Sequence, residues 1–338
     1  MNKIQPLKID IFSHILPPKY KQALDKAAPG HMQQKANDAI PTLYDLDHRF
    51  RIMEKYDVMH VLTVSRPPLE EVFVNAPKKA VDFAKRANDE VAELVMKYPD
   101  KFPAGVATVA LNDVDASLKE LERAIVDLKF RGVQIYTHVN DKPLDSAEFM
   151  PLFEMMSRFN LPVWLHPTTG ITSTDYKSQP VSKHMVATLF GWPYETTVAM
   201  NRFVFGGILE KLPNLKVITH HGGAMVPYLE QRIMAFHDVG EMLHGIGNQS
   251  LLTKAPIDYY KSFYADTAIY GNAPGLMLAR GFFGNDRILF GTDFPFAGHN
   301  GERVTRQTIA AIEQMDINEE EKRKIYEDNA RSIMRLPV

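Results

Sequence analysis

Histidine and aspartate residues at the ends of apolar segments are the side chains in this sequence best suited to chemistry. They are His14, His166, His220, His221 and Asp293, and each lies at or just after the end of a short, mainly apolar run. Imidazole and carboxylate groups bind divalent metal ions, and a catalytic zinc ion typically has three protein ligands and one open position. The chain has 0 cysteines, which excludes thiolate metal sites and disulfides.

The elements that must position these residues are parallel strands joined by helices. Eight apolar runs rich in β-branched residues predict strands at 7–14, 58–65, 102–110, 132–137, 161–167, 215–223, 263–268 and 287–295. Helical periodicity predicts helices between and after them, among them 80–98, 115–129, 146–159, 304–315 and 318–336, the last beginning at Asn318. The expected fold class is α/β, a (β/α)8 TIM barrel, in which the carboxyl ends of the strands meet at one point.

Each of these residues, taken singly, also fits a role without chemistry. A strand histidine is commonly a hydrogen-bonded core residue, and GTDFP (291–295) fits a strand-to-loop turn capped by Asp293. The residue types coincide at four predicted strand ends, and that coincidence favours a metal site.

Length and composition predict one globular domain over residues 1–338. Hydrophobic residues make up 45% and charged residues 24% of the chain, and 39 Lys plus Arg against 41 Asp plus Glu give a net charge of −2. That balance gives no electrostatic basis for binding nucleic acid or an anionic membrane. No apolar run has the length of a membrane span, and MNKIQPLKID lacks a signal-peptide core, so we expect a cytoplasmic protein. Insertions at 15–44 and 168–200 follow strands and are expected to wall a substrate pocket.

Several segments resemble, in the same order, the amidohydrolase-2 branch of the amidohydrolase superfamily. The matching segments are IDIFSHILP (9–17), GVQIYTHVN (132–140), VWLHP (163–167), GWPYETTVAMNRFVFGGILEKLPNLKVITHHGGAMVPYLEQRI (191–233), FYADTA (263–268) and ILFGTDFPF (288–296). Within that branch the chain is similar to non-oxidative decarboxylases typified by 2-amino-3-carboxymuconate-6-semialdehyde decarboxylase. The resemblance implies one divalent metal ion, zinc or manganese, and a small carboxylic acid as substrate.

The resemblance also implies roles for particular residues. His14, His166 and Asp293 would be metal ligands, and His221 would be the acid/base histidine, with Asp293 a second candidate for the catalytic proton. Arg232 matches an arginine that holds a substrate carboxylate in related decarboxylases, in some of them across a subunit interface. A guanidinium suits that task because its donors meet a carboxylate in two parallel hydrogen bonds.

Two positions depart from the family pattern. Phe12 stands where the family has a histidine or glutamate ligand, and Thr168 replaces the usual tryptophan after HP. Phenylalanine has no lone pair, so the site loses a ligand, and three remain. Phe12 either fills the barrel interior or shapes the substrate pocket, and both Phe12 and Thr168 are predicted to contact substrate.

Three functions follow from these patterns. The leading one is metal-dependent decarboxylation of a small aromatic or unsaturated carboxylic acid. The second is metal-dependent hydrolysis or hydration, and the third is a metal-free barrel in which Phe12 marks a decayed site. No glycine-rich phosphate loop occurs, so no nucleotide cofactor is expected. The apolar stretch 185–205 and the possible interface role of Arg232 predict a homodimer.

Overall fold

Parallel strands form the interior of the molecule. The computed structural model describes residues 6–168, 174–242 and 252–336. Its strands are β1 (Lys8–Ile15), β2 (Val58–Val64), β3 (Ala107–Thr108), β4 (Val133–Tyr136), β7 (Val163–His166), β8 (Val217–Thr219), β9 (Tyr264–Asp266) and β10 (Ile288–Leu289), with a small antiparallel pair of β5 (His138–Val139) and β6 (Lys142–Pro143). One parallel sheet has the order β10-β9-β8-β7-β4-β3, and β1 pairs with β2 in parallel.

Hydrogen bonds join these two sheets at both of their edges. On one side, Ser13 of β1 forms a parallel bridge with Phe294, beyond the end of β10. On the other, Leu62 of β2 bridges Gly105, and its backbone N–H lies 3.0 Å from the carbonyl oxygen of Ala104. The chain is therefore a mixed α/β structure whose parallel strands are linked from β1 around to β10.

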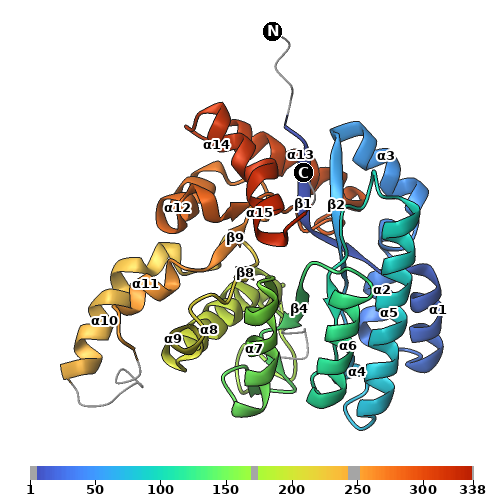
Figure 1. Ribbon diagram of the computed structural model, residues 1–338, viewed down its shortest axis with the longest axis horizontal. Coiled ribbons are helices and arrows are strands. Elements are labelled where there is room, and N and C mark those ends of the chain that lie inside the picture. The colour runs from blue at the N-terminus through green and yellow to red at the C-terminus, as the bar shows by residue number, and fades with distance from the viewer. Residues whose placement is uncertain (1–5, 169–173, 243–251, 337–338) are drawn as a thin grey trace.

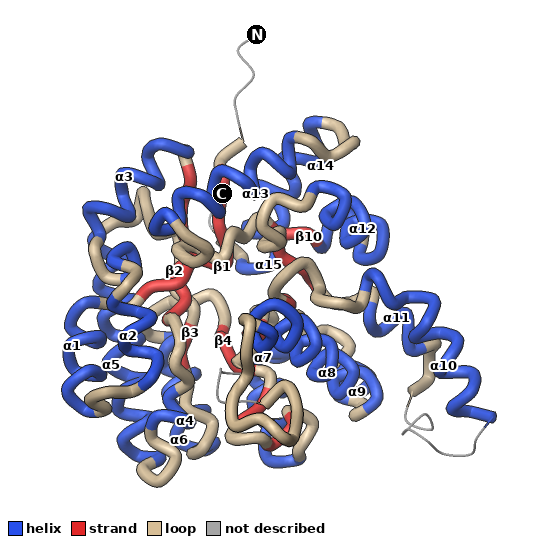
Figure 2. The backbone as a smooth tube through the Cα atoms, turned by 180° about the vertical axis from the view of Figure 1, so that it is seen from behind, coloured by secondary structure: helices blue, strands red, loops and turns tan. Residues whose placement is uncertain are grey.

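Helices surround the strands on the outside (Figure 2). The α-helices are α1 (Pro18–Ala27), α2 (Met32–Asp38), α3 (Leu46–Tyr56), α4 (Leu69–Val72), α5 (Pro77–Lys97), α6 (Val114–Val126), α7 (Met150–Phe159), α8 (Trp192–Phe205), α9 (Ile208–Lys211), α10 (Glu230–Met242), α11 (Pro256–Tyr260), α12 (Ala273–Phe283), α13 (Glu302–Glu313), α14 (Glu319–Arg323) and α15 (Asn329–Met334). Short 3-10 or π turns are η1 (Pro41–Leu43), η2 (Ala147–Phe149), η3 (Ala187–Gly191), η4 (Pro227–Leu229), η6 (Asn285–Arg287), η7 (His299–Gly301) and η8 (Lys324–Asp328). Among the described residues, no helix is both long and apolar enough to cross a membrane.

The predicted alternation of strands and helices is confirmed, with shorter strands than expected in places. The predicted strand 215–223 ends at Thr219, because His221, Gly222 and Gly223 adopt left-handed backbone angles that break the extended conformation. The predicted helix 318–336 begins after Asn318 as expected. The side chain of Asn318 accepts a hydrogen bond from the Glu321 N–H at 3.0 Å, and the Glu321 carboxylate accepts one from the Asn318 N–H at 3.0 Å. A π turn, η8, then interrupts that helix.

Two apolar clusters pack against the two faces of the strands. One fills the space between strands and helices, and the other, with Ile11, Val61, Trp164 and Ile218, lies among the strands themselves. The indole N–H of Trp164 donates to the carbonyl oxygen of Ile11 at 3.0 Å, which satisfies its polar group inside this cluster. Strands buried on both faces explain why their sequences are nearly continuous apolar runs.

A buried arginine on α3 fixes the carboxyl end of β1. The guanidinium of Arg49 donates to Ser13 Oγ at 2.8 Å, to the Thr42 carbonyl oxygen at 3.2 Å and to the carbonyl oxygen of His14. It also lies 4.7 Å from the ring centroid of Phe294. Burial lowers the pKa of Arg49 to about 9, although the nearby carboxylate of Asp10 acts to raise it. At neutral pH the side chain is therefore charged.

Replacing Arg49 by methionine is expected to destabilise the protein by about 3 kcal/mol, because buried carbonyl groups lose a charged donor. The measurement is urea unfolding followed by circular dichroism. The matched control is Arg51→Met on the same helix, where the side chain is exposed and little change is expected. Equal losses in the two variants would contradict this role of Arg49.

Candidate metal and proton-transfer site

The histidines predicted from the sequence meet at the carboxyl ends of the strands. His14 lies near the end of β1, His166 ends β7, and His220 follows β8 directly. Their ring nitrogens form a group in which one atom from each lies within 4.8 Å of the others. A second group, whose ligand atoms also lie within 4.8 Å of one another, contains His220, His221 and Asp293. The structure therefore brings together all five strand-end candidates, His14, His166, His220, His221 and Asp293, and it places His220, for which no ligand role was predicted, in both groups.

The donor atoms have the spacing that a metal ion requires. Asp293 Oδ1 lies 3.3 Å from Nε2 of His14 and 3.3 Å from Nε2 of His220. Two ligand atoms on a tetrahedral zinc ion lie about 3.4 Å apart when each bond is about 2.1 Å. Nε2 of His14 is buried and has no hydrogen-bond partner among the described residues. These nitrogen and oxygen donors fit a divalent ion.

Burial and mutual contact shift the pKa values of these groups. Burial lowers the pKa of His14 and holds that of His166 well below its usual range. Burial alone would raise the pKa of Asp293, but its contacts with His14 and His220 hold it well below the usual value. Burial disfavours a charged His220 too, yet the neighbouring carboxylates of Asp266 and Asp293 raise its pKa to about 9. The metal-free site thus holds an ionised carboxylate beside a protonated imidazole.

Asp266, at the end of β9, is a site residue that the sequence did not single out. Its carboxylate contacts Nδ1 of His220 and accepts from the N–H groups of Gly222 at 2.9 Å and Ala268 at 3.0 Å. These bonds fix the His220 ring so that Nε2 faces Asp293. The only signal in the sequence was its place at the carboxyl end of the FYADTA strand.

Phe12 lies beneath the site and is fully buried, with 0% of its surface exposed. Its ring stacks on the imidazole of His220, with centroids 3.8 Å apart and planes at 13°. The ring of His14 is 5.5 Å away, centroid to centroid. Phe12 therefore supports the histidines from inside, and the predicted contact between Phe12 and substrate remains a prediction.

His221 lies outside His220, at the partly exposed rim of the site. Its Nε2 atom is 3.9 Å from Asp293 Oδ2 and 3.4 Å from the hydroxyl oxygen of Tyr270. The indole ring of Trp192 lies 6.0 Å from its ring, centroid to centroid. Burial and the nearby His220 lower the pKa of His221 to about 4, so its ring is neutral at pH 7.

Thr168 is buried and all of its polar groups have partners. Its N–H donates to Glu195 Oε1 at 3.0 Å, its hydroxyl donates to Glu71 Oε1 at 2.9 Å, and its carbonyl accepts from Arg66. Its predicted role in substrate binding stays a prediction, because the following residues 169–173 lie outside the described part of the chain.

Arg232 is not brought to the histidines of its own chain. It lies on α10, which projects from the edge of the molecule (Figure 1). Its side chain is exposed, and its guanidinium lies 4.4 Å from the ring centroid of Phe236. The predicted contact between Arg232 and substrate therefore stays a prediction.

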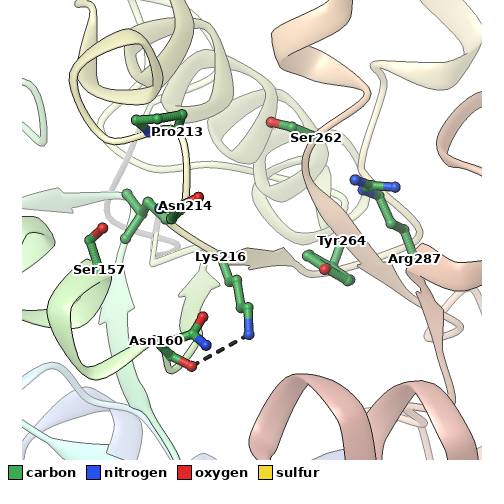
Figure 3. Close-up of a pocket in the computed structure, with 9 residues that line it drawn as sticks. Ser157, Asn160, Pro213, Asn214, Lys216, Ser262, Tyr264 and Arg287 are labelled. Atoms are coloured by element: carbon green, nitrogen blue, oxygen red, sulfur yellow. Dashed lines mark hydrogen bonds between the residues drawn. The ribbon is translucent and has the colours of Figure 1, made fainter.

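A cavity of about 550 Å³ lies at the opposite ends of the strands from the histidines. It is lined in part by Asn160, Lys216, Tyr264 and Arg287, which precede or begin β7, β8, β9 and β10. Figure 3 shows Lys216 directed toward Asn160, whose carbonyl oxygen is 3.4 Å from Nζ, while Arg287 lies on the other side of Tyr264. The two cations do not converge, so this cavity has no catalytic arrangement.

Comparisons with known proteins agree over nearly the whole chain. A family model described as Amidohydrolase matches residues 9–336. The 2-amino-3-carboxymuconate-6-semialdehyde decarboxylase of Dictyostelium discoideum is 28% identical over 329 residues, which cover 91% of this chain and 86% of that protein. A 2,6-dihydroxybenzoate decarboxylase solved with 2,6-dihydroxybenzoate is 26% identical, with a TM-score of 0.80 and coverage of 98% of this chain and 100% of that one. The 5-carboxyvanillate decarboxylase of Novosphingobium aromaticivorans, solved with manganese and 4-hydroxy-3-methoxy-5-nitrobenzoic acid, is 24% identical, with a TM-score of 0.83 and coverage of 99% and 98%.

The raised pKa of His220 predicts a pH dependence of stability in the metal-free protein. The His220 proton stabilises the fold fully below pH 6.5, and that contribution is lost as the pH rises from 6.5 through about 9. The difference corresponds to roughly 3 kcal/mol. Asp266→Asn removes the charge that raises the pKa, so thermal unfolding between pH 6.5 and 9 should show a smaller loss in that variant.

The wild-type protein is the control for this comparison, measured after removal of metal with a chelator. Burial raises the pKa of Glu70 to about 8, so Glu70 contributes to the loss of stability in both proteins equally. Equal slopes for wild type and Asp266→Asn would contradict the pairing of His220 with Asp266.

Proposed function

Because the chain belongs to the amidohydrolase family, whose model matches residues 9–336, we propose that it decarboxylates a small aromatic or unsaturated carboxylic acid with the help of a divalent metal ion. The observation that carries this proposal is the buried group of His14, His166, His220 and Asp293 with His221 at its open side. The family and the enzyme class predicted from the sequence are confirmed by the similar decarboxylases.

The metal ion would be held by His14, His166, His220 and Asp293. The sequence predicted three of these ligands, and His220 would supply the fourth, which offsets the ligand lost at Phe12. When bound, the ion would polarise the carboxylate or a neighbouring hydroxyl oxygen of the substrate. Zinc and manganese both accept imidazole and carboxylate ligands, and manganese is bound in the similar Novosphingobium decarboxylase.

His221 is the residue best placed to move the catalytic proton. Loss of CO2 breaks a carbon–carbon bond and leaves an electron pair on the substrate carbon, which must then receive a proton. The His221 ring is neutral at pH 7, so the proton that it passes on must first reach Nε2 from the substrate's own hydroxyl or carboxyl group or from water. The low pKa of the ring then makes its protonated form a strong acid toward carbon. Asp293 Oδ2, 3.9 Å from that nitrogen, remains the second candidate for this step.

Hydrolysis or hydration is the second candidate function. The same contact between His221 and Asp293 beside the metal ligands would activate a water molecule. The metal-free alternative has less support, because imidazole nitrogens and a carboxylate oxygen from separate strand ends converge in one buried place.

We also infer that the strands close into a (β/α)8 barrel that forms one domain over residues 1–338. Support comes from the parallel bridges at both edges, Ser13 with Phe294 and Leu62 with Gly105. In such a barrel the site lies at the carboxyl ends of the strands, where the histidines are found. A cytoplasmic location stays a prediction from the sequence.

A homodimer would explain the apolar surface beside the site. Phe190 in η3, Tyr194 in α8 and Tyr228 in η4 are 67%, 63% and 79% exposed, and Arg232, in the first turn of α10, is exposed as well. Aromatic residues and arginine are enriched at interfaces. We propose that two copies of the chain bury this surface and that Arg232 of each binds the substrate carboxylate in the other.

Metal content and carbon dioxide release test the proposed reaction. Wild type is expected to hold close to one divalent ion per chain by plasma mass spectrometry, and His166→Ala and Asp293→Ala are expected to lose it. His48→Ala, on α3, is the control and should retain the metal. A panel of 2-hydroxybenzoates should include a substrate that releases one CO2 per molecule consumed.

Two results would contradict the proposal. Product formation without CO2 would favour hydrolysis or hydration. Protein that takes up neither zinc nor manganese would favour the metal-free alternative.

Mixing two inactive variants tests the role of Arg232. Arg232→Gln should raise KM strongly and keep its metal, and His166→Ala should be inactive. If Arg232 serves the partner site, a mixed dimer contains one complete site, so re-equilibrated mixtures should recover up to about a quarter of wild-type activity. Mixtures that recover nothing, or a monomer by light scattering, would rule out an Arg232 contribution across the interface.

A further inference from the structure

Tyr270 reaches into the site from the loop between β9 and α12. Its hydroxyl donates to Asp293 Oδ2 at 2.7 Å and lies 3.4 Å from Nε2 of His221. The side chain is 42% exposed, so its ring stands at the solvent side of the site. No pattern in the sequence had marked this residue.

The backbone holds Tyr270 in place by an uncommon conformation. Tyr270 has φ of 55°, and the two groups that it contacts, His221 and Asp293, have φ of 58° and 64°. Non-glycine residues adopt this left-handed region rarely, and such strain persists at functional sites where the surroundings impose it. Gly271 follows with φ of 89°, and a Cβ there would lie 3.1 Å from that of Gln307, so the turn also requires a glycine.

The two oxygens of Asp293 have separate partners. Oδ1 faces inward, 3.3 Å from Nε2 of His14 and of His220. Oδ2 faces outward and accepts the hydroxyl of Tyr270. Because rotation of a carboxylate about its last torsion is broad and soft, the direction of Oδ1 depends on what holds Oδ2.

We propose that Tyr270 is a positioning residue of the metal site, whose hydroxyl holds Oδ2 of Asp293 so that Oδ1 points at the histidine nitrogens. This inference rests on the metal binding in the proposed function, and not on the reaction. It gives Asp293 an outer partner, as Asp266 is the outer partner of His220. Outer partners of metal ligands commonly change metal affinity or activity by about 10- to 100-fold when removed.

The test is Tyr270→Phe, which keeps the ring and removes only the hydroxyl. Titration calorimetry of metal-free protein with Mn²⁺ should show a Kd raised about 10-fold, with an unchanged melting temperature of the metal-free form. The matched control is Tyr56→Phe. The hydroxyl of Tyr56 also donates to a carboxylate, that of Glu302 at 3.2 Å, on α3 and α13, and its loss should leave the Kd for Mn²⁺ unchanged.

Several outcomes separate this role from others. A Kd within twofold of wild type would overturn the proposal. Unchanged metal affinity together with tighter binding of 2-nitrophenol would also overturn it, since Tyr270 would then only cover the site. If the wild-type protein bound no Mn²⁺, that result would contradict both the metal dependence of the proposed function and the role of Tyr270. Weaker Mn²⁺ binding by Tyr270→Phe in a protein that releases no CO2 from any substrate would support Tyr270 and contradict the proposed reaction.

Discussion

The negative charge of Asp293 in a dry interior is the constraint on which the rest of the site depends. A buried carboxylate is costly unless positive charge and hydrogen bonds surround it. Three segments far apart in sequence surround the carboxylate. The end of β1 contributes His14, the residue after β8 is His220, and the loop after β9 contributes the hydroxyl of Tyr270. In the metal-free chain the protonated His220 balances the charge. A divalent ion among the same atoms would balance it more completely and would displace that proton, so metal affinity should depend on pH.

The groups around Asp293 form an ordered series from the interior to the solvent. Deepest are Phe12, which stacks on one face of the His220 ring, and Asp266, which binds its Nδ1 atom. Farther out are His221 and Tyr270, which are partly exposed and contact Oδ2. The inner groups are rigid because they are packed within strands. Among the described residues of the site, His221 and Tyr270 are the partly exposed ones, so we expect substrate to approach from their side.

Sequence patterns could predict the strand ends, and with them most of the residues that the proposed metal site would use as ligands. Period-two alternation and apolar runs fix which residues end each strand, so His14, His166 and Asp293 could be predicted to converge. The pattern stops at Thr219, and the left-handed turn at His221 then brings two adjacent histidines into one site, which alternation would send to opposite faces. Asp266 and Tyr270 act through hydrogen bonds to other site residues and to the backbone, and such bonds leave no periodic signal in the sequence. In the proposed dimer, the role of Arg232 depends on a second chain, which one sequence does not describe.

The ligand that Phe12 cannot supply would be replaced by His220 in the proposed site. A ligand at position 12 would approach the metal from β1, where the Phe12 ring now lies 3.8 Å from that of His220. An imidazole there would stand in contact with the ring of His220, so the two rings would compete for the same position beside Asp293. With phenylalanine, His220 can instead turn its Nε2 toward Asp293 and serve as the ligand itself. The number of donors is then kept, while the side of the site next to β1 becomes apolar and closed to water. In the proposed metal site, the partly exposed side would then be the one that His221 and Tyr270 share.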